Sequence, residues 1–198
     1  MSTWKVEYEI DGVWSKIRLE ETEQVFSNYR RAVVRAARSN LRKLGKNASG
    51  RLSKSLSVAV RKEDYLFEWY PDGLPYWQFV DYGVQGAKSN LKAPESPFKF
   101  GTGTGPKGKL VPAIDKWVVV KPIPDARDEK GKFIPRKDMV RSIARSVYLN
   151  GLETTYFFTD PIFNLWKRYE LQFEDAMFVD VDAALSEKIP TDIKMYLG

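Results

Sequence analysis

The stretch GTGTGPKGKL, residues 101–110, has the glycine spacing of a phosphate-binding loop. It fits G-x-G-x-x-G and most of a Walker A motif through Gly103, Gly105 and Gly108. A Walker A loop requires a Ser or Thr hydroxyl after its Lys to bind Mg²⁺, and here Leu110 follows Lys109. Pro106 also removes one of the backbone N–H groups that would hold the phosphates. The sequence therefore predicts a mobile, lysine-bearing loop that docks against a partner, and not a nucleotide site.

The residue types of the chain exclude most catalytic chemistry. No Cys and no His occur among the 198 residues, which excludes thiolate nucleophiles, the Ser/His/Asp triad and most transition-metal sites. Four acids could bind a hard cation, but we interpret them as a solvated helix face: Glu174, Asp175, Asp180 and Asp182. The sequence also shows no pair of acids whose spacing would suit a hydrolase that uses carboxylates alone. We expect a non-enzymatic protein without cofactor or metal.

Charge is distributed unevenly along the chain, whose net charge is +6. Every charged side chain from Gln24 to Lys62 is basic, whereas the part from Glu153 onward is mainly acidic. Dense like charge on one helix destabilises a monomer unless an anion neutralises it, although a solvated face is an alternative. Six residues are therefore candidate contacts to DNA or to an acidic neighbour: Arg30, Arg31, Arg35, Arg38, Arg42 and Lys43.

Alternating and helical periodicities predict the elements of the N-terminal part. Strand-like alternation on both sides of Asp11-Gly12 predicts a hairpin. Three- and four-residue spacing of apolar residues over 20–45 predicts a long helix that ends at Gly45. The period changes again at Leu56, which predicts a second hairpin with its turn at residues 62–64.

An aromatic run extends from the second hairpin into the segment LPYWQFVDYGV. This segment predicts a short helix that exposes Gln78 and Asp81 and buries Tyr76, Phe79 and Val80. The run could stack on bases of single-stranded nucleic acid, but we favour core packing for its members: Trp69, Tyr70, Tyr76, Trp77, Phe79 and Tyr82.

Residues 83–109 form a predicted long loop rich in Gly, Ser, Pro and Lys. Loops of this length are often functional, so we expect contacts between subunits. The candidate residues are Gly83, Gly86, Lys88, Pro97, Phe98, Lys107 and Lys109. Helical patterns follow over 110–120 and 138–150, and a long helix is predicted to begin at Thr159 or Asp160.

Together these patterns predict an α+β protein in which antiparallel β-hairpins pack against a long amphipathic basic helix, with a helical C-terminal part. We place a core domain at 1–120 and a helical extension at 121–198. The N-terminal segment has no apolar signal region, and we expect synthesis in the cytosol with no membrane contact.

The segments NASGRLSKSLSVAV, YWQFVDYGVQGAKS and APESPFKF, in this order after a helix, carry a resemblance to a known family. The chain resembles the tail-completion or neck proteins of tailed double-stranded DNA bacteriophages over roughly residues 20–120. In that family a helix and a G-R-L-x-x-S segment lead into a hairpin, a Y-x-x-F-V-x-x-G stretch and a proline-bearing loop. The matching positions are Gly50, Arg51, Leu52, Ser55, Tyr76, Phe79, Val80, Gly83, Pro97 and Phe98.

The resemblance implies a structural virion subunit, assembled in the host cytoplasm, that forms a homo-oligomeric ring at the phage neck or tail end. Its partners would be other neck or tail proteins and the double-stranded DNA passing through the lumen, with no small-molecule substrate. The N-terminal hairpin and the long C-terminal helix depart from the family pattern, which leaves open the ring to which the subunit belongs. The alternative is a nucleic-acid-binding protein free in the cytosol.

Overall fold

The structure is a computed structural model that describes residues 5–10, 13–63, 66–101, 105–106, 108–121, 123, 127 and 129–188, except the side chains of 5–10, 13–16, 62–63, 66–67 and 188. Its elements in chain order are β1 (Lys5–Ile10), β2 (Val13–Arg18), α1 (Glu20–Lys43), α2 (Arg51–Ser55), β3 (Ser57–Glu63), β4 (Leu66–Asp72), α3 (Trp77–Asp81), α4 (Leu110–Val120), α5 (Arg136–Asn150) and α6 (Thr159–Lys188). The predicted α+β class is confirmed.

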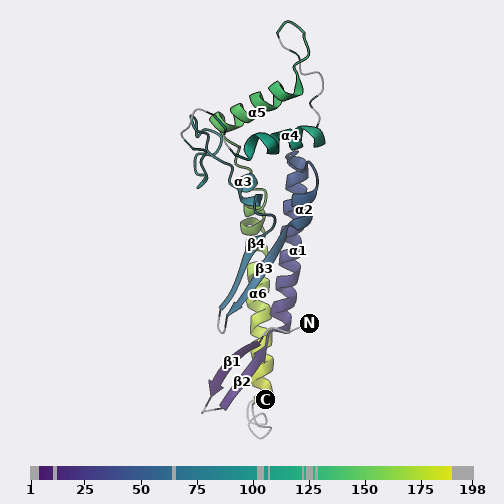
Figure 1. Ribbon diagram of the computed structural model, residues 1–198. Coiled ribbons are helices and arrows are strands. Elements are labelled where there is room, and N and C mark those ends of the chain that lie inside the picture. The colour runs from purple at the N-terminus through teal and green to yellow at the C-terminus, as the bar shows by residue number, and fades with distance from the viewer. Residues whose placement is uncertain are drawn as a thin grey trace. The chain divides into compact units, whose positions relative to one another are not determined.

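The four strands form two separate antiparallel hairpins (Figure 1). In the first hairpin Val6 is opposite Ile17, and in the second Val60 is opposite Trp69. The predicted turn at Asp11-Gly12 lies outside the described residues. The predicted turn at 62–64 is wrong for Lys62 and Glu63, which still pair with β4, and residue 64 lies outside the described residues.

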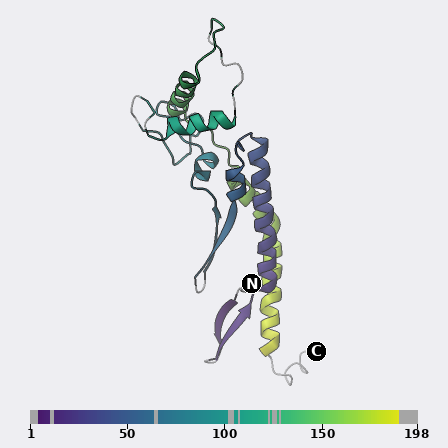
Figure 2. The same cartoon turned by 45° about the vertical axis from the view of Figure 1, so that its right-hand side comes forward.

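The chain forms two compact units, and each is assembled from segments that are distant in the sequence. Unit 1 contains Met1–Ala36, Ser57–Asp72 and Asp160–Gly198, and unit 2 contains Ala37–Leu56 and Gly73–Thr159. This division differs from the predicted boundary after residue 120. The reason is that α6 returns beside α1, as Figures 1 and 2 both show, so the two ends of the chain belong to one unit.

The centre of unit 1 is an aromatic cluster around Tyr29 of α1. The Tyr29 ring is fully buried and makes edge-on contacts with Trp69 of β4 and with Trp166 and Tyr169 of α6, with centroid distances of 5.3, 5.9 and 5.5 Å. Its hydroxyl donates a hydrogen bond of 2.9 Å to the Ile162 carbonyl oxygen. Burial raises the pKa of Tyr29 far above its usual value. The β3–β4 hairpin thus packs on the basic helix as predicted.

Asp180 of α6 caps the N-terminus of α1 within unit 1. Its carboxylate is buried and accepts hydrogen bonds from the Glu21 and Thr22 amides at 3.0 and 2.9 Å, and from the Thr22 hydroxyl at 2.7 Å. A carboxylate at this position also interacts favourably with the helix dipole. The prediction that Asp180 belongs to a solvated acidic face is therefore wrong, because a helix start distant in the sequence uses it.

Unit 2 is built around the segment 83–100, which is held against residues 148–154. Val84 and Leu152 exchange backbone hydrogen bonds of 3.0 and 2.8 Å, and the Gln85 amide donates to the Phe98 carbonyl at 2.8 Å. The Gln85 side chain also donates to the carbonyls of Pro94 and Ser96. This part of the predicted loop is an ordered piece of the fold.

The short helix α3 exposes Gln78 as predicted, but most of its other side chains differ from the prediction. Trp77 and Asp81 are buried, whereas Tyr76 and Phe79 are both 42 % exposed. Trp77 packs against Phe158 at a centroid distance of 5.5 Å. The Asp81 carboxylate is buried because the Phe158 and Thr159 amides need an acceptor, and the hydropathy pattern of α3 could not reveal that need.

Candidate interaction surfaces

The arginines predicted as contacts on α1 differ in what they touch. Arg30, Arg35, Arg42 and Lys43 are exposed. Arg31 is also exposed and donates to the Ser27 carbonyl and the Asn28 side chain of its own helix, at 3.1 and 2.8 Å. Such local bonds contribute little to stability and leave the guanidinium edge at the surface. These five residues therefore remain candidate contacts.

Arg38 has a structural role that the sequence analysis missed. Its Nε donates a hydrogen bond of 2.8 Å to the Ser53 carbonyl, and its Nη2 donates to the carbonyls of Lys54 and Leu56 at 3.5 and 3.4 Å. The last carbonyls of a helix have no intrahelical donor, so a guanidinium with several N–H groups satisfies the end of α2. Arg38 thus fixes α2 to α1 and is a poor candidate for a partner contact.

This difference predicts unequal effects on stability. We expect Arg38→Ala to lower the free energy of unfolding by about 2 kcal/mol, since carbonyls bonded to a charged donor lose their partner. Arg35→Ala removes an exposed guanidinium and should change it by less than about 0.5 kcal/mol. Urea unfolding of both variants measures the difference. Equal stability of the two variants would contradict the role assigned to Arg38.

The candidate residues of the 83–109 loop also divide into structural and exposed groups. A Cβ atom on Gly83 would lie 2.6 Å from the Leu152 carbonyl oxygen, and one on Gly86 would lie 2.2 Å from that of Leu149. Phe98 packs edge-on against Phe79 at 4.6 Å. Lys88, Pro97 and Lys109 are exposed, and Lys107 lies outside the described residues. Among the described residues, the exposed members remain candidates for contacts between subunits.

A second basic surface lies on α5 and was not singled out from the sequence. Lys137, Arg141 and Arg145 follow each other at four-residue spacing, which places them along one side of the helix, and all three are exposed. Arg141 lies 3.9 Å from Asp138, which is the single acid of α5. The signal was present in the sequence as this four-residue spacing, but the denser basic stretch of α1 obscured it.

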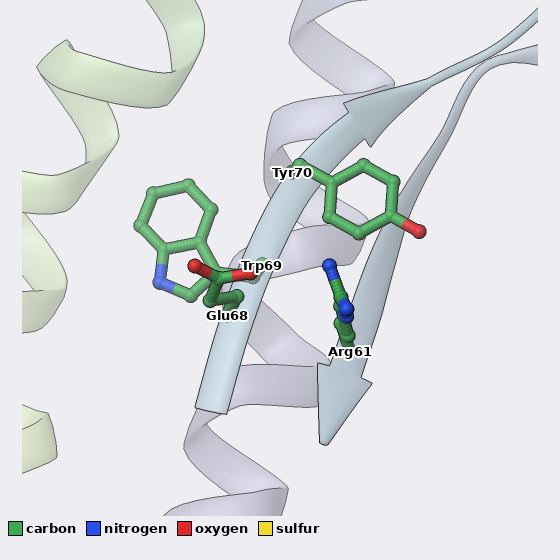
Figure 3. Close-up of a pocket in the computed structure, with 4 residues that line it drawn as sticks. All are labelled: Arg61, Glu68, Trp69 and Tyr70. Atoms are coloured by element: carbon green, nitrogen blue, oxygen red, sulfur yellow. The ribbon is translucent and has the colours of Figure 1, made fainter. Parts of the chain in front are cut away.

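A hollow of about 540 Å³ at the β3–β4 hairpin is lined by Arg61, Glu68, Trp69 and Tyr70. Arg61 and Glu68 are directly opposite in the strand register. Figure 3 shows Arg61 and Tyr70 on one side of β4 and the Trp69 indole on the other. One carboxylate opposite one guanidinium favours an ion pair and does not provide the two acids of a carboxylate hydrolase.

The division into units separates the charges more sharply than the sequence order does. Unit 2 carries 20 Lys and Arg against 8 Asp and Glu, whereas unit 1 carries 12 against 18. The net charges are therefore +12 and −6, which together give the +6 of the chain. The acids of both chain ends come together in unit 1, because α6 returns to it. The chain thus has one basic and one acidic unit.

Comparison with protein families, with curated proteins and with solved structures finds no match for this chain. Within the described residues, no group of three or more acids is arranged to hold a metal ion. None of the helices in the part of the chain that the structure describes is long and apolar enough to cross a membrane.

Proposed function

We propose that this chain is a non-enzymatic structural subunit that assembles into a ring at the neck or the tail end of a tailed double-stranded DNA bacteriophage. The observation that carries the proposal is the separation of charge, with +12 on unit 2 and −6 on unit 1. Unlike charges on two parts of one subunit favour a head-to-tail contact between copies. Such a heterologous contact closes into a ring when the rotation between subunits allows it.

Two of the positions behind the phage resemblance, Gly50 and Ser55, have defined roles in the fold. Gly50 adopts a left-handed conformation, with φ of 72°, directly before α2. The Ser55 hydroxyl accepts a hydrogen bond of 3.0 Å from the Leu74 amide, which fixes the entry into α3. Both residues help to position α2, which supports the use of the G-R-L-x-x-S segment as part of the pattern.

Basic residues of the subunit are the proposed contacts to the DNA that would pass through the lumen. The candidates are the exposed basic residues of α1 and α5, namely Arg30, Arg31, Arg35, Arg42, Lys43, Lys137, Arg141 and Arg145. Both groups lie on helices, so their charges are held at regular spacing. Contacts to phosphates alone would suit a channel through which any sequence moves.

Light scattering of the purified full chain, at low and high salt and over a range of concentrations, tests the ring. We expect a closed oligomer of defined mass, and electron microscopy should show an open lumen. A monomer under every condition, or an oligomer without a lumen, would contradict the proposal.

The alternative function is a free nucleic-acid-binding protein, which the +12 charge of unit 2 favours. Titration of the chain with double-stranded DNA at several salt concentrations separates the two proposals. For phosphate contacts the logarithm of the association constant falls with the logarithm of salt concentration, with a slope of about −0.9 per phosphate neutralised. A steep slope measured on a protein that stays monomeric would support the alternative.

A further inference from the structure

Helix α6 has two apolar faces, and the described residues of unit 1 cover one of them. Ile162, Ala176 and the aromatic side chains around Tyr29 define the inner face. On another side of the helix, Leu171, Phe178 and Leu185 follow each other at seven-residue spacing. Leu171 is 69 % exposed and Phe178 is 73 % exposed. A sustained exposed apolar stripe of this kind indicates an interaction surface.

The outer stripe of α6 carries negative charge. Glu174 lies three residues after Leu171 and four before Phe178, so it projects from the same side of the helix. Within the described residues Glu174 has no ion pair. Glu170, Asp175 and Asp182 are also exposed along this part of α6. Pairing of two α6 stripes would bring like charges together, which argues against a symmetric contact between them.

Helix α4 of unit 2 also has an exposed apolar face, and the charge on that face is opposite to that of the α6 stripe. Its inner residue Val118 is buried, whereas Trp117, Val119 and Val120 are exposed, with Val119 at 60 %. Lys116 is exposed and lies three and four residues before the two exposed valines, on the same side of the helix. Within the part of the chain that the structure describes, Lys116 has no ion pair. The outer face of α4 is therefore apolar with a central positive charge.

We propose that the outer face of α4 in one copy of the chain docks on the outer stripe of α6 in the next copy, with Lys116 beside Glu174 of the neighbour. The inference rests on the proposed ring and names the surfaces that would join its subunits. Both faces are apolar and carry opposite central charges, so burial of the apolar side chains does not leave either charge unpaired. Because the two faces differ, the contact is heterologous and continues from copy to copy.

Charge reversal provides the sharpest test. Glu174→Lys and Lys116→Glu each place like charges at the contact, and we expect each to weaken self-association at least tenfold in sedimentation velocity. The double variant restores opposite charges in swapped positions and should recover most of the association. Glu187→Lys, 13 residues further along α6 and on another side of the helix, and Lys92→Glu on an exposed loop make the same charge changes away from both faces. These two controls should associate like the wild type.

A third variant, Phe178→Ser, tests the apolar part of the contact. Phe178 is exposed, so its loss should leave the circular dichroism spectrum of the subunit unchanged while it weakens association at least tenfold. Oligomers that persist unchanged in both charge-reversal variants would overturn the proposed contact and leave the ring intact. A double variant that fails to recover association would also overturn it. A wild-type chain that is monomeric at every concentration would overturn both proposals together.

Discussion

Replacement of Gly86 by alanine is expected to lower the free energy of unfolding by about 4 kcal/mol, near the upper end of single-substitution effects. A Cβ atom at this position would lie 2.2 Å from the Leu149 carbonyl oxygen and 2.6 Å from the Gly151 amide nitrogen. These are backbone atoms at the end of α5, so they cannot rotate away as a side chain does. The Ala87 and Lys88 amides also donate to the carbonyls of Tyr148 and Leu149 at 2.9 and 3.1 Å. Relief of the clash would therefore break this packing.

Gly101→Ala is the matched control for Gly86→Ala. No atom lies within 4 Å of a Cβ added at Gly101. We expect this variant to change the free energy of unfolding by less than about 0.5 kcal/mol. Urea unfolding followed by circular dichroism measures both. If Gly86→Ala were as stable as Gly101→Ala, the close contact between 83–86 and the end of α5 would be wrong.

Loss of the Asp81 carboxylate is expected to lower the free energy of unfolding by about 3 kcal/mol, because buried donors would lose a charged acceptor. Asp81 is fully buried and accepts hydrogen bonds from the Phe158 and Thr159 amides, at 2.7 and 3.3 Å, and from the Thr159 hydroxyl. These amides lie at the start of α6, where backbone N–H groups have no intrahelical acceptor. Asp81→Ala therefore removes the cap of the longest helix.

Two further variants give this experiment its controls. Asp81→Asn keeps the shape and one acceptor oxygen, so its loss of stability should be about half as large. Glu153→Ala removes an exposed carboxylate that lies 3.8 Å from Lys46, and should change the free energy of unfolding by less than about 0.5 kcal/mol. Tryptophan fluorescence in urea reports on the transition, because Trp77 packs against Phe158. A loss at Asp81→Ala no larger than at Glu153→Ala would contradict the capping role.

The periodicities of the sequence determined most elements of this protein. The long basic helix was predictable because its apolar residues repeat at helical spacing and Gly45 follows its end. The structure places Gly45 at φ of 63°, with hydrogen bonds from the Gly45 and Lys46 amides back to the Arg42 and Leu41 carbonyls. The hairpins were predictable for the same reason, since alternation and turn residues are local signals. The exclusion of Cys- and His-based chemistry needed composition alone.

The candidate contacts were only partly predictable. Sequence identified the exposed arginines of α1, because a run of basic residues on a helix is visible without a structure. It could not distinguish Arg38 from Arg35, since the carbonyls that Arg38 satisfies belong to α2, which follows a turn. Residues 83–109 were predicted to form one long loop, but the part 83–100 is tightly packed, because glycine and proline signal a loop equally well when its backbone is held by hydrogen bonds. Most of the stretch 102–107, predicted to be mobile, lies outside the described residues.

Composition and local periodicity thus determined most of the helices and strands, and excluded Cys- and His-based chemistry. Tertiary structure alone decided that Asp81 and Asp180 are buried caps, that α6 returns beside α1, and that the acids of both chain ends meet in one unit. The physical reason is that the first backbone amides of a helix need hydrogen-bond acceptors, and a residue distant in the sequence supplies them. Local spacing encodes the amphipathic face of an element, but it does not encode which distant element covers that face.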